Sequence, residues 1–328
     1  MPANKISEFR EEYFFLSNFA ETTLTLDGLT FQSAEAAFQS MKARSKEIRA
    51  TFCSMTPRQA KAAGRTVELR QDWEQVKDSI MKRVLIAKFR DIGLRTMLLA
   101  TGDALLVEGN SWNDTYWGVC GGKGQNKLGT LLMEVRELYR YPRRLFVDMD
   151  GTVVEWKAVS SYDELYEKGY FSSLEPYQTV VDAIQLIHEE IPVVDIFTLS
   201  AVLPDSLHSI PEKNVWLDNH MPFIDEQHRL FTWNGTPKHG AAPGGIRLHD
   251  TLLDDYSKNL FEWEADAAVT GAKGVKLLNG INGTQGTWQH AWKGACVSRY
   301  APPGEIVTGI LSRMFDGPLP WAEALTNR

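Results

Sequence analysis

Residues 145–152 read Leu-Phe-Val-Asp-Met-Asp-Gly-Thr, and this stretch decides the fold of the second half of the chain. Its first three residues form a short uninterrupted apolar run, which is typical of a strand buried on both faces of a parallel sheet. Asp148 and Asp150 follow at once, and Gly151 permits a sharp turn. In open α/β sheets, functional groups gather beyond the carboxyl ends of the strands. The stretch therefore predicts an α/β domain with two carboxylates at the edge of its sheet.

The sequence after this stretch alternates between strand-like and helix-like segments. Such alternation indicates a parallel sheet covered by helices, which is a Rossmann-like α/β fold. The pattern is helical at 180–187 and 306–315, strand-like at 193–197, 252–253 and 276–278, and turn-rich at 280–287.

The first 140 residues have a different pattern, mainly helical with a short strand-rich start, and predict an α+β domain. Tyr141-Pro142-Arg143-Arg144 ends the last helical pattern, because a proline does not continue a helix. We therefore expect two domains, residues 1–140 and 144–328. The first domain is predicted to contain a hairpin at 24–31 with its turn at Asp27-Gly28, helices from Ser33, from Thr56-Pro57, along 76–89 and along 128–138, and a glycine-rich loop at 118–124.

The composition is that of a globular protein with no membrane span. The 328 residues carry a net charge of −7 and three isolated cysteines, and no apolar run reaches the length of a transmembrane helix. The polar N-terminus has no signal-peptide pattern. We expect a cytoplasmic protein without a broad grip on nucleic acid, although a local cation cluster or a metal ion can still bind a small anion.

Asp148 and Asp150 provide the two carboxyl groups that a phosphoryl-transfer site uses. One carboxylate serves as a nucleophile, and a second carboxyl group transfers protons. Their oxygens are also the ligands that Mg²⁺ prefers. An Asp-Gly turn on its own is common at protein surfaces, so the position directly after an apolar strand is the informative feature.

This part of the chain resembles the haloacid-dehalogenase superfamily, and more closely its cytosolic 5′(3′)-deoxyribonucleotidase branch. Three later strings occur in the family's order: Ile-Phe-Thr-Leu-Ser-Ala at 196–201, Pro-Glu-Lys-Asn-Val-Trp-Leu at 211–217 and Leu-Leu-Asp-Asp-Tyr at 252–256. The resemblance implies a strand-end hydroxyl, a phosphate-binding lysine and an acidic metal motif. The candidates are Ser200 with Thr198 in reserve, Lys213 with Lys238 competing for the same role, and Asp254 and Asp255.

The resemblance implies a defined reaction. Asp148 would attack phosphorus to form an aspartyl-phosphate, and Asp150 would protonate the leaving oxygen and then activate water. Mg²⁺ would be held by Asp148, Asp150 and Asp254, with Asp255 as an alternative ligand. Only about 50 residues separate the first two motifs, so any cap is small, and we place it in the aromatic-rich segment 156–177.

The first domain resembles the NADAR family (NAD- and ADP-ribose-associated), whose members cleave N-glycosidic bonds in riboflavin-pathway intermediates or in ADP-ribosylated guanine. The matching strings include Phe-Gln-Ser-Ala-Glu-Ala-Ala-Phe at 31–38, Leu-Arg-Gln-Asp-Trp-Glu at 69–74 and Asp-Thr-Tyr-Trp-Gly at 114–118. Such cleavage passes through a cation-like sugar, so Glu35 and Asp114 are the catalytic candidates. Several relatives carry Glu-His where this chain has Glu35-Ala36. The predicted ligand-binding residues are Trp73 and Trp117 for a base, Lys42, Lys88 and Arg136 for phosphates, and Asn126.

The sequence thus predicts a bifunctional hydrolase that joins an N-glycosidase to a Mg²⁺-dependent phosphatase or nucleotidase. Its expected partner is a nucleotide or an ADP-ribose-like small molecule, including ADP-ribosylated guanine in nucleic acid. The alternative is a phosphatase whose N-terminal part only holds an ADP-ribose-like ligand, and release of free base distinguishes the two. A second alternative is an inactive phosphatase domain that serves dimerisation. The oligomeric state is left open.

Overall fold

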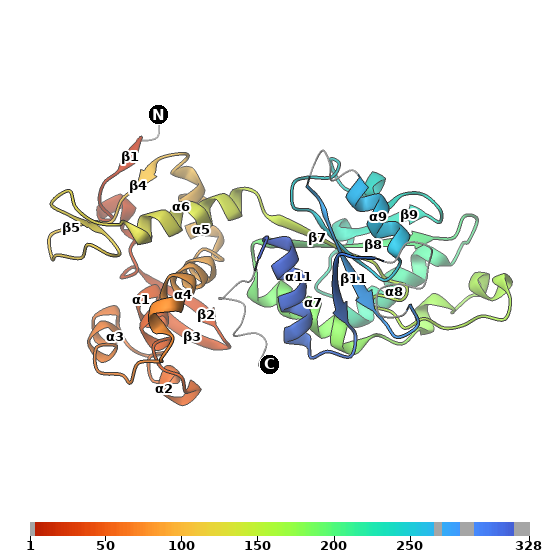
Figure 1. The fold of residues 1–328 in the computed structure, drawn as a ribbon, viewed down its shortest axis with the longest axis horizontal. Coiled ribbons are helices and arrows are strands. Elements are labelled where there is room, and N and C mark those ends of the chain that lie inside the picture. The colour runs from red at the N-terminus through yellow and green to blue at the C-terminus, as the bar shows by residue number, and fades with distance from the viewer. Residues whose placement is uncertain (1–3, 266–270, 283–291, 318–328) are drawn as a thin grey trace. The chain divides into compact units, whose positions relative to one another are not determined.

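The computed structural model describes residues 4–265, 271–282 and 292–317 (Figure 1). The internal contacts divide the chain into two units, Met1–Pro142 and Arg143–Arg328. The two-domain architecture, with an α/β sheet domain in the second unit, agrees with the expected fold class. Among the described residues, no helix combines the length and the apolar character needed to cross a membrane.

The first unit is a set of helices with three small two-stranded sheets. Its helices are α1 (Ala34–Ser40), α2 (Lys46–Ala50), α3 (Pro57–Ala63), α4 (Trp73–Lys88), α5 (Ile92–Ala100) and α6 (Lys127–Arg140). Its strand pairs are β1 (Lys5–Ile6) with β4 (Leu105–Leu106), β2 (Glu21–Leu26) with β3 (Leu29–Ser33), and β5 (Gly109–Asn110) with β6 (Val119–Cys120). A 3₁₀ helix, η1, spans Glu11–Leu16.

The predicted hairpin turn and the predicted helix starts of this unit are present in the structure. The hairpin of β2 and β3 turns at Asp27 and Gly28, which both have positive φ angles. Ser33 caps α1 by accepting a hydrogen bond from the N–H of Ala36, and Thr56 forms a capping box at the start of α3. These predictions are confirmed. The predicted glycine-rich loop differs in one respect, because it contains the short strand β6.

Helix α1 lies at the centre of the first unit. All of its residues are buried, and it packs against α3, α4 and the hairpin. Ala34, Ala36 and Ala37 have no exposed surface, which permits this close packing on several sides. The packing holds Glu35, on the first turn of α1, inside the unit.

The second unit contains a six-stranded, entirely parallel sheet in the order β12-β11-β10-β7-β8-β9. Its strands are β7 (Arg143–Val147), β8 (Val194–Val202), β9 (Arg229–Trp233), β10 (Thr251–Asp254), β11 (Lys273–Leu278) and β12 (Ala295–Ser298). Its helices are α7 (Gln178–Glu190), α8 (Ser209–His220), α9 (Ser257–Ala265) and α11 (Pro303–Met314), with the 3₁₀ helices η2 (Tyr162–Tyr166), η3 (Phe171–Ser173), η4 (Glu226–His228) and η5 (Lys238–Ala241).

Both faces of this sheet are covered. Phe146 packs with Phe197 and with Trp263 of α9, while its neighbours Leu145 and Val147 are equally inaccessible to solvent. Helices α7 and α11 contact each other, as Figure 1 shows, and both contact strands of the sheet. Burial on both faces is what a continuous apolar run such as 145–147 predicts.

The strand order places a topological switch point between β7 and β10. From β7 the chain moves outward to β8 and β9, and it then returns to β10 on the other side of β7. A crevice forms at the carboxyl ends of strands where the order reverses in this way. Asp148 follows β7 and Asp254 ends β10, so both lie at this crevice.

Several predicted strands are longer in the structure. The predicted strand 193–197 extends to Val202 within β8, and 276–278 is the end of β11, which begins at Lys273. The buried Lys273 and Lys276 interrupt the apolar pattern of β11, so the sequence pattern predicted only the last part of this strand. The predicted helices 180–187 and 306–315 lie within α7 and largely within α11. Of the predicted turn-rich segment, residues 283–287 lie outside the described residues.

A buried ion pair joins the first strand of this sheet to the segment before β10. The guanidinium of Arg144 donates two hydrogen bonds to the carboxylate of Asp250, and both side chains are almost completely buried. Arg144 also donates to the carbonyls of Pro243 and Gly245, each at 2.7 Å. The pair therefore closes the long connection from η5 onto β7.

Replacing Asp250 by alanine should lower the free energy of unfolding of the second unit by about 3 to 5 kcal/mol, because it leaves the guanidinium buried without its partner. Urea unfolding of the full chain, followed by the fluorescence of the buried tryptophans, measures this change. The double variant Arg144→Met/Asp250→Leu serves as the control and should recover part of the loss. Unchanged unfolding of Asp250→Ala would contradict the role of the pair.

Candidate active sites

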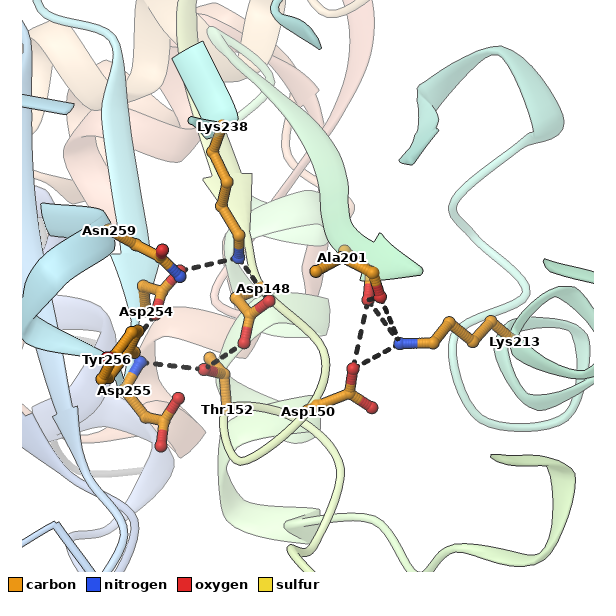
Figure 2. Close-up of polar contacts among 11 residues, drawn as sticks. Asp148, Asp150, Thr152, Ala201, Lys213, Lys238, Asp254, Asp255, Tyr256 and Asn259 are labelled. Atoms are coloured by element: carbon orange, nitrogen blue, oxygen red, sulfur yellow. Dashed lines mark hydrogen bonds and ion pairs between the residues drawn. The ribbon is translucent and has the colours of Figure 1, made fainter. Parts of the chain in front are cut away.

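Three carboxylates converge at the switch point of the second unit. Asp148, Asp254 and Asp255 each place a carboxylate oxygen within 4.8 Å of the others. They follow or end the adjacent strands β7 and β10, so the parallel pairing of these strands brings them together (Figure 2). Gly151 passes close to Asp255, since a Cβ atom at this glycine would lie 2.7 Å from Oδ2 of Asp255. The turn after β7 therefore requires a residue without a side chain.

Lys238 supplies the cation at the centre of this cluster. Its ammonium donates hydrogen bonds to Asp148 Oδ1 and to Asp254 Oδ2, the latter at 2.7 Å (Figure 2). Burial alone lowers the pKa of Lys238, but Asp148 and Asp254 outweigh this effect and raise it. The lysine thus stays charged and couples η5 to the ends of two strands.

The carboxylates exceed the positive charge available from Lys238. Burial raises the pKa of Asp148, and the neighbouring Asp254 and Asp150 raise it further, while Lys238 opposes them. Burial likewise raises the pKa of Asp255 well above its ordinary value, with Asp254 and Asp148 adding to the effect. A set of buried oxygen ligands with unbalanced negative charge fits a hard divalent cation such as Mg²⁺.

Neutral side chains hold the carboxylates in place. Thr152 donates to Asp148 Oδ2 at 3.0 Å and accepts from the backbone N–H of Asp255 at 3.1 Å. Asn259 donates to Asp254 Oδ2 at 2.9 Å. Thr152 therefore links the loop after β7 to the end of β10. The sequence carried no signal for Asn259, and it showed Thr152 only as the last residue of the opening stretch.

A second polar group surrounds Asp150. Lys213, on α8, donates to the Asp150 carboxylate, to Ser200 Oγ at 2.7 Å and to the carbonyl of Ala201 at 3.0 Å. Ser200 Oγ lies 3.5 Å from Asp150 Oδ2. The hydroxyl of Thr198 is buried and has no hydrogen-bond partner among the described residues. Of the two hydroxyl candidates, the structure thus brings Ser200 to Asp150, and it places Lys213 beside Asp150 and Lys238 beside Asp148.

Both groups open into one cavity of about 780 Å³. Asp148, Asp150, Asp255 and Lys238 line its floor. Side chains from 156–177, the segment between β7 and α7 that was predicted as the cap, line another part of the wall. These cap residues are Trp156, Lys157, Tyr162, Leu165, Tyr170, Phe171 and Leu174.

In the first unit, Glu35 is a buried carboxyl group at the start of α1. It accepts a hydrogen bond from Gln39 at 3.0 Å, and only 6% of its surface is exposed. Burial raises its pKa, and Gln39, Lys61 and Lys42 partly oppose this shift. Lys42, one turn beyond α1, donates to the carbonyl of Gly64 at 2.9 Å, and its pKa is lowered by burial.

Aromatic rings gather beside Glu35. Phe38 lies 5.2 Å from Trp73 and 5.3 Å from Trp117, measured between ring centroids. The ammonium of Lys42 lies 5.7 Å from the centroid of Trp73. The structure therefore brings the two predicted base-stacking tryptophans into contact with one phenylalanine, Phe38, which lies on the same helix as Glu35.

Asp114 is fixed by its own loop. Its Oδ1 accepts hydrogen bonds from the backbone N–H groups of Tyr116 at 3.1 Å and Trp117 at 2.9 Å. Asn110 holds the backbone of Asp114 through two further hydrogen bonds. After burial, Asp114 also raises the pKa of Glu35, so the two predicted catalytic carboxyl groups lie within electrostatic range of each other.

Glu108, which the sequence did not single out, is a partly buried carboxyl group of this unit. Its Oε2 has no hydrogen-bond partner within the described part of the chain. Burial, reinforced by Asp114, raises its pKa to about 7, while Lys61 and Lys88 oppose the shift. Asp114 and Lys61 influence the pKa values of both Glu35 and Glu108. Glu108 lies between β4 and β5, and no local pattern distinguishes it from a surface glutamate.

Three predicted ligand-binding residues have partners inside the first unit. Lys88 is fully buried and donates to the carbonyl of Ser17 at 2.7 Å, and burial lowers its pKa to about 7. Arg136 is buried on α6 and donates to Thr101 and to the carbonyl of Ala104. Asn126 bonds the backbone of Leu106 and Glu108. The structure does not bring Arg136 to Glu35, because its guanidinium joins α6 to the end of α5.

Comparisons with known proteins match each unit separately. Residues 5–140 match the NADAR domain, and residues 152–291 match the family described as 5′ nucleotidase, deoxy (pyrimidine), cytosolic type C protein. The N-glycosidase YbiA of Escherichia coli is 42% identical over 132 residues, which cover 39% of this chain and 82% of that protein. The N-glycosidase Npun_R5314 of Nostoc punctiforme is 39% identical over 139 residues, covering 40% and 88%.

Two further matches concern the first unit. The riboflavin biosynthesis protein VVA0006 of Vibrio vulnificus is 31% identical over 163 residues, which cover 46% of this chain and 44% of that protein. The NMR structure of the E. coli protein YbiA is 41% identical, covers 41% of this chain and 84% of its own, and has a TM-score of 0.38.

Replacing Glu108 by glutamine should stabilise the first unit at alkaline pH. The pKa of Glu108 is raised from 4.5 to about 7, so the folded state binds more protons than the unfolded state between these values. Stability is therefore lost as the pH rises through this window, and the variant should be more stable than the wild type at pH 8 by about 1 to 3 kcal/mol. Urea unfolding at pH 4 and pH 8 measures the difference, with the exposed Glu12→Gln as the control. Equal stability of Glu108→Gln and wild type at both pH values would contradict the burial of an ionisable Glu108.

Proposed function

We propose that this chain, which belongs to the NADAR family through its first unit, is a bifunctional hydrolase that joins an N-glycosidase to a Mg²⁺-dependent nucleotidase. Both units are hydrolase domains. The observation that carries the proposal is the convergence of Asp148, Asp254 and Asp255 with Lys238 at the switch point of the sheet. We assign the glycosidase to residues 1–140 and the nucleotidase to residues 144–328.

In the nucleotidase, Asp148 is the nucleophile. One of its oxygens attacks phosphorus, the bond from phosphorus to the ester oxygen breaks, and Asp150 gives a proton to the departing oxygen. Water then attacks the aspartyl-phosphate while Asp150 takes its proton, and this step frees inorganic phosphate and restores Asp148. The place of both aspartates at the cavity, with Asp148 pinned by Thr152, supports this division of roles.

The two lysines have different tasks in this proposal. Lys238 already bridges Asp148 and Asp254, so it neutralises charge where the nucleophile meets the phosphoryl group. Lys213 and Ser200 hold Asp150 and offer donors to the phosphoryl oxygens. We therefore assign the main phosphate-clamping role to Lys238, the competitor in the sequence interpretation, and a supporting role to Lys213.

Asp148, Asp254 and Asp255, with the backbone carbonyl of Asp150, are the groups that would hold Mg²⁺. When bound, the ion offsets negative charge on the phosphoryl oxygens. The three carboxylates and Lys238 carry a net charge of about −2 when all are ionised, which a single divalent cation balances. The substrate class is a small nucleotide, in keeping with the family matched by this unit.

In the glycosidase, Glu35 stabilises the sugar cation or activates the attacking water, and Asp114 assists it. The raised pKa of Glu35 favours a role in proton transfer, and the rings of Trp73 and Trp117, which pack against Phe38 of the same helix, offer flat faces for a base. The relatives that are named N-glycosidases support this reaction class. Its substrate is an ADP-ribosyl or ribosyl-phosphate N-glycoside.

Asp148→Asn should reduce Mg²⁺-dependent hydrolysis of a nucleoside monophosphate by at least about 10³-fold, because the change removes the nucleophile. Release of inorganic phosphate with and without Mg²⁺ measures the effect. The exposed Asp163→Asn, in the same unit, is the matched control and should retain the wild-type rate. A rate near that of the wild type in Asp148→Asn would exclude Asp148 as the nucleophile.

Glu35→Gln should abolish the release of free base from an ADP-ribosyl or ribosyl-phosphate substrate and leave phosphate release intact. Glutamine keeps the size of the side chain but has no carboxylate to stabilise a cation. Mass spectrometry of both products from one reaction provides the measurement. If the wild type binds such a substrate and never releases base, the first unit is a binding module. Loss of both activities together would instead indicate misfolding.

A further inference from the structure

The cap segment of the second unit is attached to α8 through a buried carboxylate, Glu212. Its Oε1 accepts a hydrogen bond from the backbone N–H of Gly169 at 2.6 Å, and its Oε2 accepts one from the backbone N–H of Phe171 at 3.0 Å. Only 8% of the surface of Glu212 is exposed. Hydrogen bonds to an ionised acceptor in a buried place are among the stronger contacts of a protein.

The local backbone is shaped for this contact. Gly169 has a φ of +95°, and its N–H points to the carboxylate together with that of Phe171. Positive φ is readily adopted by glycine alone among the common residues. The segment 169–171 therefore forms a small anion-binding turn that Glu212 fills from the neighbouring helix.

A second contact on the same helix supports the attachment. Trp216, one turn after Glu212, is fully buried and donates from Nε1 to the carbonyl of Leu174 at 2.8 Å. Between them, Lys213 places its ammonium 4.7 Å from the centroid of Phe171. Helix α8 thus holds the cap at two points and presents to the catalytic group the lysine that binds Asp150.

The attached segment forms part of the cavity wall. Tyr170, Phe171 and Leu174 all line the cavity, and the hydroxyl of Tyr170 donates to the carbonyl of Lys157 at 3.1 Å, farther back in the cap. The rings of Tyr170 and Phe171 pack edge to face at 5.0 Å. A shift of the turn at 169–171 would therefore move both rings relative to Asp150 and Lys213.

We propose that Glu212 is a positioning residue that fixes the aromatic cap, and that it thereby sets the preference of the nucleotidase site for phosphate esters with a large planar leaving group. The inference rests on the proposed function of the second unit and extends it to a residue outside the catalytic group. Aromatic rings discriminate a planar leaving group from a small one only if they are held in place. Within the described part of the chain, the proposed phosphate-binding groups Lys238, Lys213 and Ser200 form their hydrogen bonds with residues other than Glu212.

Four forms of the full chain test this proposal: wild type, Glu212→Gln, Trp216→Phe and Val215→Ala. Glutamine keeps the size of Glu212 but turns an NH₂ group toward one of the two N–H donors. Phenylalanine removes the Nε1 donor of Trp216 together with part of its buried ring system, so its thermal unfolding is compared with that of the wild type. Val215 lies on the same helix with about half of its surface exposed and serves as the matched control. Calorimetry without Mg²⁺ measures the binding of deoxyuridine 5′-monophosphate and of inorganic phosphate to each form.

The wild type should bind the nucleotide more tightly than inorganic phosphate. Glu212→Gln should weaken nucleotide binding by about tenfold, as expected for the loss of a charged hydrogen bond, and leave the affinity for phosphate within about twofold. Trp216→Phe should also weaken the binding of the nucleotide, and Val215→Ala should change the affinity for neither ligand. Thermal unfolding detects whether Glu212→Gln is folded. If it is not, the binding of the two ligands to Trp216→Phe tests the proposal.

Equal weakening of both ligands, no weakening of either, or a wild type that does not distinguish them would each overturn the proposal. Hydrolysis of the same nucleotide with Mg²⁺ is measured in parallel and judges the nucleotidase assignment separately. Selective binding of the nucleotide without its hydrolysis would support the role of the cap and contradict the assignment of a nucleotidase activity. Hydrolysis by all four forms at equal kcat/KM would retain the nucleotidase and reject the role of Glu212.

Discussion

Mutual repulsion among Asp148, Asp254 and Asp255 is the constraint around which the second unit is arranged. Two adjacent parallel strands bring these carboxylates to one crevice, where burial makes each charge costly. Lys238 reaches the crevice from η5 and relieves part of the repulsion, and the remaining imbalance suits a divalent cation. The cations that relieve the repulsion among the buried carboxylates are therefore also the groups that the proposed chemistry requires.

The candidate site of the first unit handles charge in a different way. Glu35 and Glu108 have raised pKa values, chiefly because of burial, and neither forms an ion pair among the described residues, whereas Asp27 elsewhere in the unit is paired with Arg83 and Arg49. Cleavage of an N-glycosidic bond generates positive charge on a sugar, and an unpaired carboxyl group is suited to meet it. Phosphoryl transfer moves negative charge and requires cations. The two units thus differ in the sign of the charge that their sites are built to receive.

Features with local causes were predictable from the sequence. The turn at Asp27-Gly28, the capped start of α3 and the apolar run before Asp148 each depend on a few neighbouring residues. The competition between Lys213 and Lys238 could not be decided in this way, because the partner of Lys238 lies 90 residues away along the chain. For a related reason, Glu108 was not singled out, and the sequence did not show that Arg136 is buried against Thr101 and Ala104. Their burial arises from the packing of distant segments, and a single sequence shows a charged residue in the same form whether it is exposed or enclosed.

The order of strands also has a consequence for how the protein is made. β7 lies in the middle of the sheet yet is the first of its strands to be synthesised, and Arg144 meets Asp250 only after 106 further residues have been added. The first unit completes its contacts by Pro142, so it can fold on the ribosome while the second is still unfinished. During that interval β7 is an apolar segment with unpaired edges, and pairings between distant strands form slowly. The risk of aggregation during translation is therefore greatest for the strand that precedes the proposed nucleophile Asp148, and the first unit is already complete when this strand emerges.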